Sequence, residues 1–112
     1  MQSQYSGSNR ADGTGAILDP TESASVLGVL ANEGCQEVLH AIGEETRSAT
    51  EVSARVDQPM SSIYRHLDAL EQAGLLESAV RINTQGRNQQ EYSRAVDTVD
   101  VAIGEDVSVL LR

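Results

Sequence analysis

The segment between Pro59 and Gly74 constrains the fold of this chain more than any other. Pro59 disfavours helical backbone at the residue before it but fits the first turn of a new helix. Gly74 suits the position just after a helix ends. Between them, apolar residues recur at the i, i+4, i+7 spacing of a buried helical stripe: Ile63, Leu67 and Leu70. The pattern predicts a helix that runs from Pro59 to about Ala73.

A second, shorter helix is expected just before this one, at residues 51–56. Thr50 can cap its N-terminus, and Val52 and Val56 would face inward. Residues 57–59 then form a tight turn into the longer helix. Two short helices joined in this way, the second with small polar residues in its first turn, have the geometry of a helix-turn-helix.

After the longer helix the apolar period changes from 3.6 residues to 2, which indicates strands. Leu76, Val80 and Ile82 would share one strand face. A polar loop then leads to a second strand at residues 91–96. A β-hairpin directly behind a helix-turn-helix is a winged helix. The predicted fold class is α+β, mainly α: a winged helix-turn-helix with a β-hairpin wing and a short C-terminal hairpin or helix.

The flanking segments complete the expected organisation. Residues 1–18 are rich in Ser, Gly, Gln and Asn without an apolar period, so we expect a disordered tail. Helices are expected after Asp19 and at residues 34–43, and the winged domain would cover residues 19–96. In residues 97–112, alternating apolar residues are split by a Gly-Glu-Asp turn. This pattern predicts a hairpin or dimerisation segment, with a helix as the alternative.

Composition and charge limit the kinds of partner. The 112 residues include neither Trp nor Phe, so stacking of bases on aromatic side chains is close to excluded. No apolar run approaches the ~20 residues of a membrane span, and we expect a cytoplasmic protein without a membrane partner. Seventeen acids face eight bases, all of them Arg. This balance is typical of halophiles, where a Debye length of ~3 Å at molar salt makes net charge a poor guide to partners.

The position of the charges is more informative than their sum. Residues 60–95 hold four of the Arg residues against four acids, so this block is neutral within an acidic chain. A DNA contact is expected there.

The chain contains few groups that could carry other chemistry. One cysteine and two distant histidines cannot build a tetrahedral thiolate site within one chain, so we expect no metal and no cofactor. The sequence has no Gly-flanked nucleophilic serine, no phosphate-cradling Gly loop and no Cys-His pair, so we do not expect an enzyme. Cys35 opens a helix, where its thiol pKa could be lowered, but a single buried Cys is usually an apolar filler. Whether Cys35 is redox-active stays open.

The central part of the chain resembles winged-helix transcription regulators of the ArsR type, especially the small haloarchaeal ones. The resemblance covers roughly residues 22–96 and rests on three runs: Ser48 to Ser53, Pro59 to Leu67, and Asp68 to Leu76. It implies that the recognition helix faces the major groove of double-stranded DNA and that the wing lies along phosphate or the minor groove. His66, in the Arg-His-Leu position of the family, is expected to be a packed scaffold residue.

The residues expected to contact DNA lie on the recognition helix, beside it and on the wing. Ser61 and Ser62 would sit in a first helical turn, whose free N–H groups favour phosphate oxygens; capping of the helix is their alternative role. Arg65 can reach guanine or phosphate, with an ion pair to Asp68 or Glu51 as its alternative. The expected set is Thr50, Met60, Ser61, Ser62, Tyr64, Arg65, Arg81, Arg87 and Asn88.

The function predicted from these features is a sequence-specific DNA-binding transcription regulator that acts as a homodimer. Val26, Leu27 and Leu30 would supply the dimer seam with the C-terminal segment, because their apolar faces exceed what one small core needs. The alternative is a winged-helix protein-interaction module of transcription or replication machinery, which the acidic charge keeps open. The operator, the direction of regulation and any small-molecule effector are not encoded in these patterns.

Overall fold

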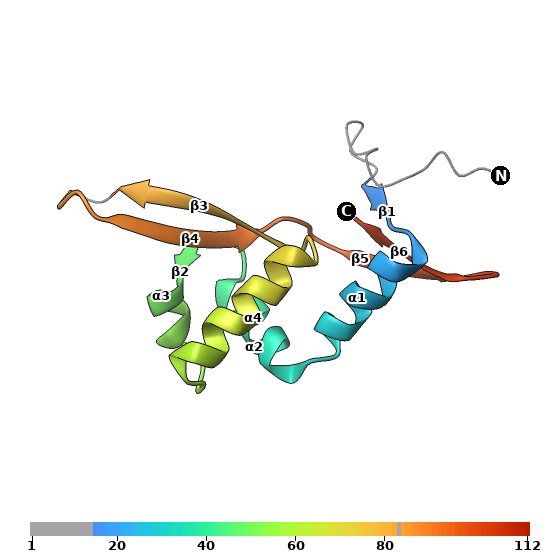
Figure 1. The fold of residues 1–112 in the computed structure, drawn as a ribbon, viewed down its shortest axis with the longest axis horizontal. Coiled ribbons are helices and arrows are strands. Elements are labelled where there is room, and N and C mark those ends of the chain that lie inside the picture. The colour runs from blue at the N-terminus through green and yellow to red at the C-terminus, as the bar shows by residue number, and fades with distance from the viewer. Residues whose placement is uncertain (1–14, 83) are drawn as a thin grey trace.

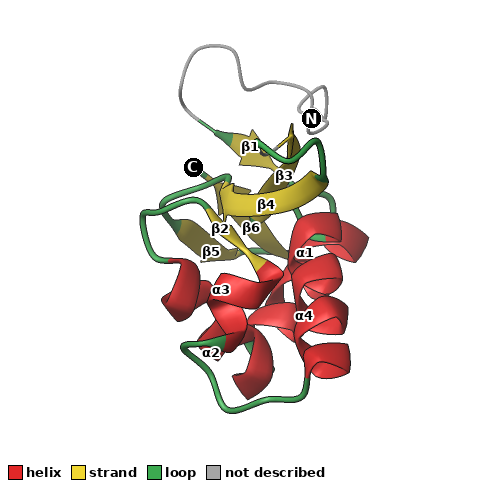
Figure 2. Cartoon of the chain, turned by 90° about the vertical axis from the view of Figure 1, so that its left-hand side faces the viewer, coloured by secondary structure: helices red, strands yellow, loops and turns green. Residues whose placement is uncertain are grey.

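The structure, a computed structural model, describes residues 15–82 and 84–112. In this part of the chain four helices gather on one side and six strands on the other (Figures 1 and 2). The helices are α1 (Pro20–Leu30), α2 (Glu33–Ile42), α3 (Ala49–Ser53) and α4 (Met60–Gln72). One antiparallel sheet has the order β2-β4-β3, formed by Arg47–Ser48, Asn88–Arg94 and Leu76–Ile82. The other has the order β1-β6-β5, formed by Ala16–Ile17, Val107–Leu111 and Val99–Ile103.

The helix-turn-helix is formed by α3 and α4, and the hairpin β3-β4 follows it directly. The strands of this hairpin pair along their whole length, from Leu76 opposite Arg94 to Ile82 opposite Asn88. The predicted winged helix-turn-helix is therefore confirmed.

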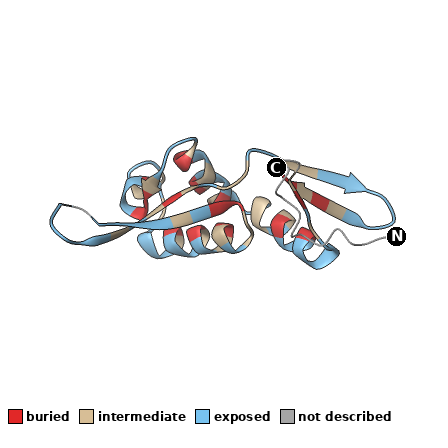
Figure 3. Ribbon diagram, turned by 90° about the horizontal axis from the view of Figure 1, so that it is seen from above, coloured by how far each residue is buried: buried red, intermediate tan, exposed pale blue. Residues whose placement is uncertain are grey.

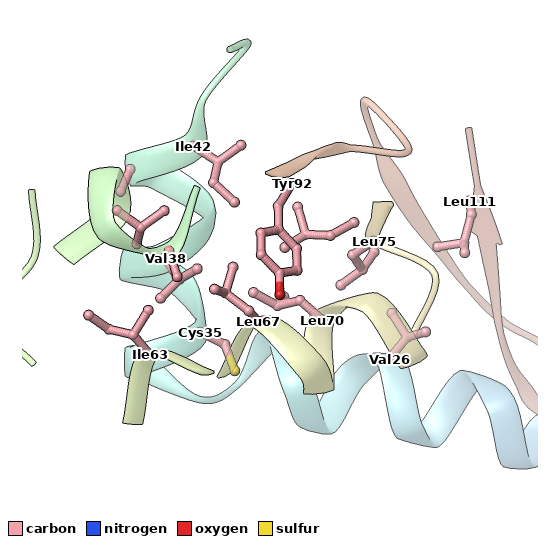
Figure 4. Close-up of a cluster of buried hydrophobic side chains, with 14 of the residues drawn as sticks. Val26, Cys35, Val38, Ile42, Ile63, Leu67, Leu70, Leu75, Tyr92 and Leu111 are labelled. Carbon is pink, nitrogen blue, oxygen red and sulfur yellow. The ribbon is translucent and has the colours of Figure 1, made fainter. Parts of the chain in front are cut away.

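The apolar stripe of α4 lies at the centre of the core (Figure 4). Ile63, Leu67 and Leu70 are completely buried against side chains of α2, α3 and the base of the wing. Tyr92 of β4 is the one aromatic residue in this otherwise aliphatic cluster. Burial of each such aliphatic side chain stabilises the fold by ~1.5–3 kcal/mol. The core thus holds α4 by one face and leaves the opposite face to solvent.

The start of α3 differs from the prediction. Ser48, not Thr50, caps the helix: the Ser48 hydroxyl accepts a hydrogen bond from the Glu51 N–H, and the Glu51 carboxylate accepts one from the Ser48 N–H. This reciprocal capping box satisfies two backbone donors at once, which a Thr50 cap without a glutamate three residues later would not do. Thr50 is left exposed in the first turn of α3.

The prediction of a disordered tail over residues 1–18 is wrong at its C-terminal end. Ala16 and Ile17 form β1, antiparallel to the end of β6, and Ala16 is buried. The N–H of Leu18 donates to the Val109 carbonyl at 2.9 Å. No local pattern shows this pairing, because the partner strand is at the other end of the sequence. Residues 1–14 lie outside the described residues.

The C-terminal segment is the predicted hairpin and not the alternative helix. Its strands β5 and β6 pair from Val99 opposite Leu111 to Ile103 opposite Val107, and α1 packs against β6. This packing removes Val26 from the predicted dimer seam, because its side chain is only 1% exposed within its own chain, whereas Leu27 and Leu30 are half-buried. The C-terminal sheet, and not a second copy, covers the inner face of α1.

The wing extends beyond the helices. Figure 3 shows that the outer half of its hairpin is exposed. Leu76, Val80 and Ile82 follow the predicted alternation, but only Leu76 is buried. Val80 and Ile82 are 63% and 69% exposed, because no helix reaches this part of the hairpin. Only the base of the wing belongs to the core.

A buried polar contact ties α1 to the C-terminal sheet. The Ser23 side chain is 2% exposed, and its hydroxyl oxygen accepts a hydrogen bond from the Val109 N–H at 3.0 Å. The same hydroxyl donates to the Leu18 carbonyl at 3.4 Å. Ser23 thus satisfies a backbone donor of β6 just beyond the end of β1.

Replacing this hydroxyl tests how α1 is anchored. Ser23→Ala leaves the Val109 N–H buried without a partner, so the free energy of unfolding should fall by ~1–3 kcal/mol in chemical denaturation. Ser25→Ala, on an exposed position of the same helix, is the matched control and should change stability by less than ~0.5 kcal/mol. Equal effects of the two substitutions would contradict this role of Ser23.

Candidate nucleic-acid interface

The first half of α4 presents five of the predicted contact residues. Tyr64 is 54% exposed and Met60 is 38% exposed, while Ser61 and Arg65 are also exposed and Ser62 is half-buried. Ser61 and Arg65 lie opposite the buried stripe and Ser62 and Tyr64 lie on its flanks, whereas Met60 continues the line of the stripe at the exposed start of the helix. They form a surface of hydroxyls, one aromatic ring, a thioether and one cation.

The two serines do not cap the helix, which removes their predicted alternative role. The N-cap position is held by Pro59, and no side chain of the described residues accepts from the first-turn N–H groups. These N–H groups and the positive end of the helix dipole therefore face outward at the start of α4. Such a turn favours contact with phosphate oxygens.

Arg65 forms neither of the ion pairs that were its alternative role, with Asp68 or with Glu51. In the part of the chain that the structure describes, its guanidinium meets only the Ser62 hydroxyl, at 3.5 Å, and pairs with neither Asp68 nor Glu51. The Glu51 carboxylate is engaged with Ser48 instead. The hydrogen bond from the Ser48 backbone lowers the pKa of Glu51. The charge of Arg65 is therefore available to a partner.

The wing carries the remaining predicted residues. Arg81 is exposed and pairs with Glu91 at 3.3 Å. Arg87 and Asn88 are exposed near the tip, where the chain turns at Gly86 with a φ of 80°. In Figure 1 the wing, α3 and the N-terminal half of α4 lie toward the same end of the molecule. The structure thus brings the predicted DNA-contacting residues to one end, away from the C-terminal sheet.

A hydrogen-bonded cluster fixes α4 against α2. Gln58, in the turn before α4, donates through Nε2 to the Gly34 carbonyl at 3.2 Å and to the Glu37 carboxylate at 2.9 Å. Its Oε1 lies 2.8 Å from Nδ1 of His66. Because an amide oxygen can only accept, this arrangement assigns the proton of the neutral ring to Nδ1. The expectation of a scaffold role for His66 agrees with these contacts.

The His66 ring also explains a glycine in α2. A Cβ on Gly34 would lie 2.3 Å from Cε1 of His66, closer than any side chain can approach. Burial lowers the pKa of His66, and the nearby Arg65 charge lowers it further, against a smaller opposing effect of Glu37. Sequence reasoning identified neither Gln58 nor Gly34, because their contacts join α2 to a turn that is distant in sequence.

The groove between α2 and the end of α3 has the opposite electrostatic character. It encloses about 1020 Å³, and its acidic lining residues are Glu33, Glu37, Glu44, Glu45 and Asp57. His40, Arg47 and Arg55 also line it. The excess of carboxylates repels phosphate. The α4–wing end is therefore the better surface for nucleic acid.

Cys35 belongs to the core. Its side chain is 2% exposed, and burial raises the pKa of the thiol, with a smaller lowering by Arg65. A protonated, covered thiol is suited to packing and not to redox chemistry. Within residues 15–82 and 84–112, no three His, Cys, Asp or Glu side chains gather as a metal site. No helix in these ranges is long and apolar enough to cross a bilayer.

A double-mutant cycle tests the contact of Gly34 with His66. Gly34→Ala should destabilise the protein by ~1–3 kcal/mol, because the methyl group displaces the ring. In a His66→Ala background the same change should be neutral or stabilising by up to ~1 kcal/mol, because Ala favours helix more than Gly. Chemical denaturation of the four proteins gives the coupling energy. An equal cost in both backgrounds would show that the ring and the glycine are not coupled.

The protonation of His66 should make stability depend on pH. Its folded-state pKa lies below the ordinary value of 6.5, so below that pH the unfolded chain binds the proton more readily. The stability from the neutral ring is fully present above pH 6.5 and is lost as the pH falls through the folded-state pKa. Denaturation curves between about pH 7.5 and 5 measure this loss of stability. The loss should be absent in His66→Gln and should remain in His40→Gln, which changes an exposed histidine. If the free energy of unfolding of His66→Gln depends on pH as it does in the wild type, another group is responsible for the titration.

Comparison with known proteins agrees with this geometry. Residues 30–79, which include α2, α3 and α4, match the family model of a helix-turn-helix domain. The crystal structure of Rv0081 from M. tuberculosis is similar, with a TM-score of 0.54 and 24% identity over 65% of this chain and 69% of that chain. At this identity the likeness shows the fold alone. A search of curated proteins gave no match. The helix-turn-helix match and the exposed face of α4 together support a DNA-binding regulator.

Proposed function

We propose that this protein is a sequence-specific DNA-binding transcription regulator that acts as a homodimer. In this proposal α4 enters the major groove of double-stranded DNA and the wing follows the phosphate backbone. The observation that carries it is the exposed first half of α4, which offers Arg65 without an ion pair among the described residues. A helix held rigidly by its buried face can present such side chains to base edges in a fixed register.

The proposed contact residues form two groups, one placed to contact base edges and one placed to contact phosphate oxygens. Ser62, Tyr64 and Arg65 lie along the helix, where hydroxyl and guanidinium groups can read base edges, Arg most often at guanine. Thr50, in the first turn of α3, and the wing residues lie outside α4 and suit phosphate oxygens. Met60 and Ser61 at the start of α4 would lie closest to the groove wall.

The net charge of −9 is compatible with DNA binding in a halophilic, archaeal setting, which we propose for this ArsR-like chain. At molar salt the counterion-release contribution is largely exhausted, so specific contacts and buried surface must carry the affinity. Cations can also bridge carboxylates to phosphates at such concentrations. The few Arg residues then need to be local to the groove, as Arg65 and the wing residues Arg81 and Arg87 would be in this proposal.

The wing contact should be independent of sequence. Arg87→Ala should weaken binding about equally on specific and random DNA, because a residue near the wing tip meets phosphate. The slope of log affinity against log salt should also become flatter by about one counterion per site. Binding titrations at several salt concentrations measure both effects. A loss confined to the specific site would show that Arg87 reads bases.

The helix contacts should be sequence-dependent. Once the operator has been selected from genomic fragments at native salt, Ser62→Ala, Tyr64→Ala or Arg65→Ala should each cost ~1–3 kcal/mol on the operator and little on random DNA. Arg112→Ala, which removes the same charge from the C-terminal sheet, is the control and should leave operator affinity nearly unchanged. Unchanged operator binding by both Arg65→Ala and Arg87→Ala would move the DNA-binding surface elsewhere and leave a protein-interaction role for α4.

A further inference from the structure

The C-terminal sheet has an edge strand with available backbone groups. In the order β1-β6-β5, strand β5 pairs with β6 and with no other strand of the described residues. Thr98 and Arg112 exchange both of their backbone hydrogen bonds, at 3.2 and 3.0 Å. Hydrogen-bonded and non-hydrogen-bonded pairs alternate along an antiparallel ladder. Val99, Val101 and Ile103 therefore direct their N–H and C=O groups away from β6.

The side chains of the same strand continue an apolar face. Val101 and Ile103 share their face of the sheet with Val109 and Leu111, which α1 buries. Beyond the reach of α1 the face is uncovered: Val101 is 49% exposed and Ile103 is 85% exposed. Ile103 is the most exposed of the large hydrophobic residues that the structure describes. An edge with both free backbone groups and an apolar face is a template for another strand.

We infer that β5 pairs with β5 of a second copy of this chain, antiparallel, about a two-fold axis at Val101. The inference rests on the homodimer of the proposed function and names its interface. In this register Val101 faces Val101 of the partner subunit, and Val99 faces Ile103 of the partner subunit. All three residues direct free backbone groups toward the partner strand, so the two strands complete each other's hydrogen bonds. A two-fold interface requires such a self-complementary strand.

Charge selects this register over its neighbours. With the axis at Val101, Asp100 faces the small, neutral Ala102 of the partner subunit. With the axis at Asp100, the apolar Ile103 would lie directly opposite the charged Asp97 of the partner subunit. With the axis at Ala102, Val99 would face the partner subunit's Glu105, in the turn of its hairpin, and fewer strand residues would pair. Of these three registers, only the axis at Val101 places each of Val99, Val101 and Ile103 opposite another of these apolar residues.

A cavity lies where the partner's most exposed side chain would arrive. It has a volume of about 290 Å³ beside Val99. Its apolar lining residues are Leu30, Leu39, Leu75, Val96 and Val99, and His40, Arg94 and Asp97 complete the lining. Directly opposite residues of an antiparallel pair place their side chains on the same face, with Cβ atoms ~4.5–5.5 Å apart. The partner's Ile103, opposite Val99, would therefore lie at this cavity, and the symmetry makes the contact twice. Leu30 of the predicted dimer seam then takes part through the cavity wall.

The rim of this interface is acidic, so its affinity should depend on salt. In the proposed register Asp97 lies opposite the partner's Glu105, and Asp106 is in the same turn. Repulsion between these carboxylates weakens the dimer at low ionic strength and is screened at molar salt. Dimerisation should therefore become tighter as salt increases.

The mass in solution tests the interface. Sedimentation at micromolar concentration in about 2 M salt should give about twice the 12.0 kDa of one chain, with partial dissociation at about 0.1 M salt. Ile103→Glu should raise the dissociation constant at least ~100-fold while circular dichroism stays unchanged. Ile82→Glu makes the same change on an exposed wing residue and should remain dimeric. A dimeric Ile103→Glu, or a wild type that is monomeric with and without DNA, would overturn the inference.

Cross-linking tests the register without disturbing the fold. Hydrogen-bonded pairs in antiparallel strands have Cα atoms ~5.5 Å apart, which is within the range of a disulfide. Val101→Cys should therefore form a covalent dimer on mild oxidation, whereas Ala102→Cys, one residue along the same strand, should not. Both variants retain the buried Cys35, so any cross-linking through Cys35 is the same in both. Cross-linking of both, or of neither, would rule out the axis at Val101.

Binding to DNA separates this inference from the proposed function. The Ile103→Glu chain should still bind random DNA like the wild type, because α4 and the wing are untouched, but should lose affinity for a two-half-site operator. If the wild type is a dimer and Val101→Cys cross-links, but the wild type binds no DNA, this would contradict the proposed function alone. Operator binding that requires Arg65 but is equally strong in a dimeric Ile103→Glu protein would contradict the β5 interface alone.

Discussion

The burial of Ile63, Leu67 and Leu70 fixes α4 about its own axis, and the chemistry of the exposed face depends on that fixed rotation. A helix turns by about 100° per residue, so holding this stripe inside determines that Tyr64 and Arg65 point outward. The apolar contacts resist rotation but are less directional than hydrogen bonds. Gln58 and His66 add directional contacts at the N-terminal end of α4. Together they hold the half of the helix that presents the candidate DNA contacts.

The distribution of charge follows from the same arrangement. The ion pairs between described side chains engage Arg81 with Glu91, Arg94 with Asp97, and Arg112 with Asp100. Of the two acids predicted to pair with Arg65, Glu51 is engaged in the capping box of α3 and Asp68 accepts a hydrogen bond from Gln72. Local hydrogen bonds thus occupy both acids, and the Arg65 cation stays available on a chain with more than twice as many acids as bases.

The parts of the fold that the sequence predicted are those set by local chemistry. Pro59 and Gly74 delimit α4 to within one or two residues, and the period-2 alternation locates the wing and the C-terminal hairpin. The start of α3 was misassigned because Thr50 is an adequate cap by itself, and the better cap at Ser48 shows only when Glu51 is considered as its partner. Of the candidate site, the exposed residues of α4 were predictable from the same period that predicts its core.

What the sequence could not supply depends on contacts between distant segments. The strand at Ala16 is defined only by its pairing with β6, and an isolated pair of residues has no strand signal of its own. Val26 looked available for a partner chain because nothing local shows that Val109 and Leu111 return to cover it. The cluster of Gln58, His66 and Gly34 is hidden for the same reason. Polar residues in a turn carry no periodicity that would point to α2.

The uncovered outer half of the wing has a consequence for how the protein fits its ligand. Val80 and Ile82 have no helix beneath them, so the tip is held mainly by the hydrogen bonds between β3 and β4. A segment with exposed backbone bonds and few buried contacts opens at a free-energy cost well below that of global unfolding. Its amides should exchange hydrogen faster than those near Leu76 and Tyr92, which share the core. In the proposed complex with DNA, the more flexible wing would follow differences in groove width while α4 keeps its register.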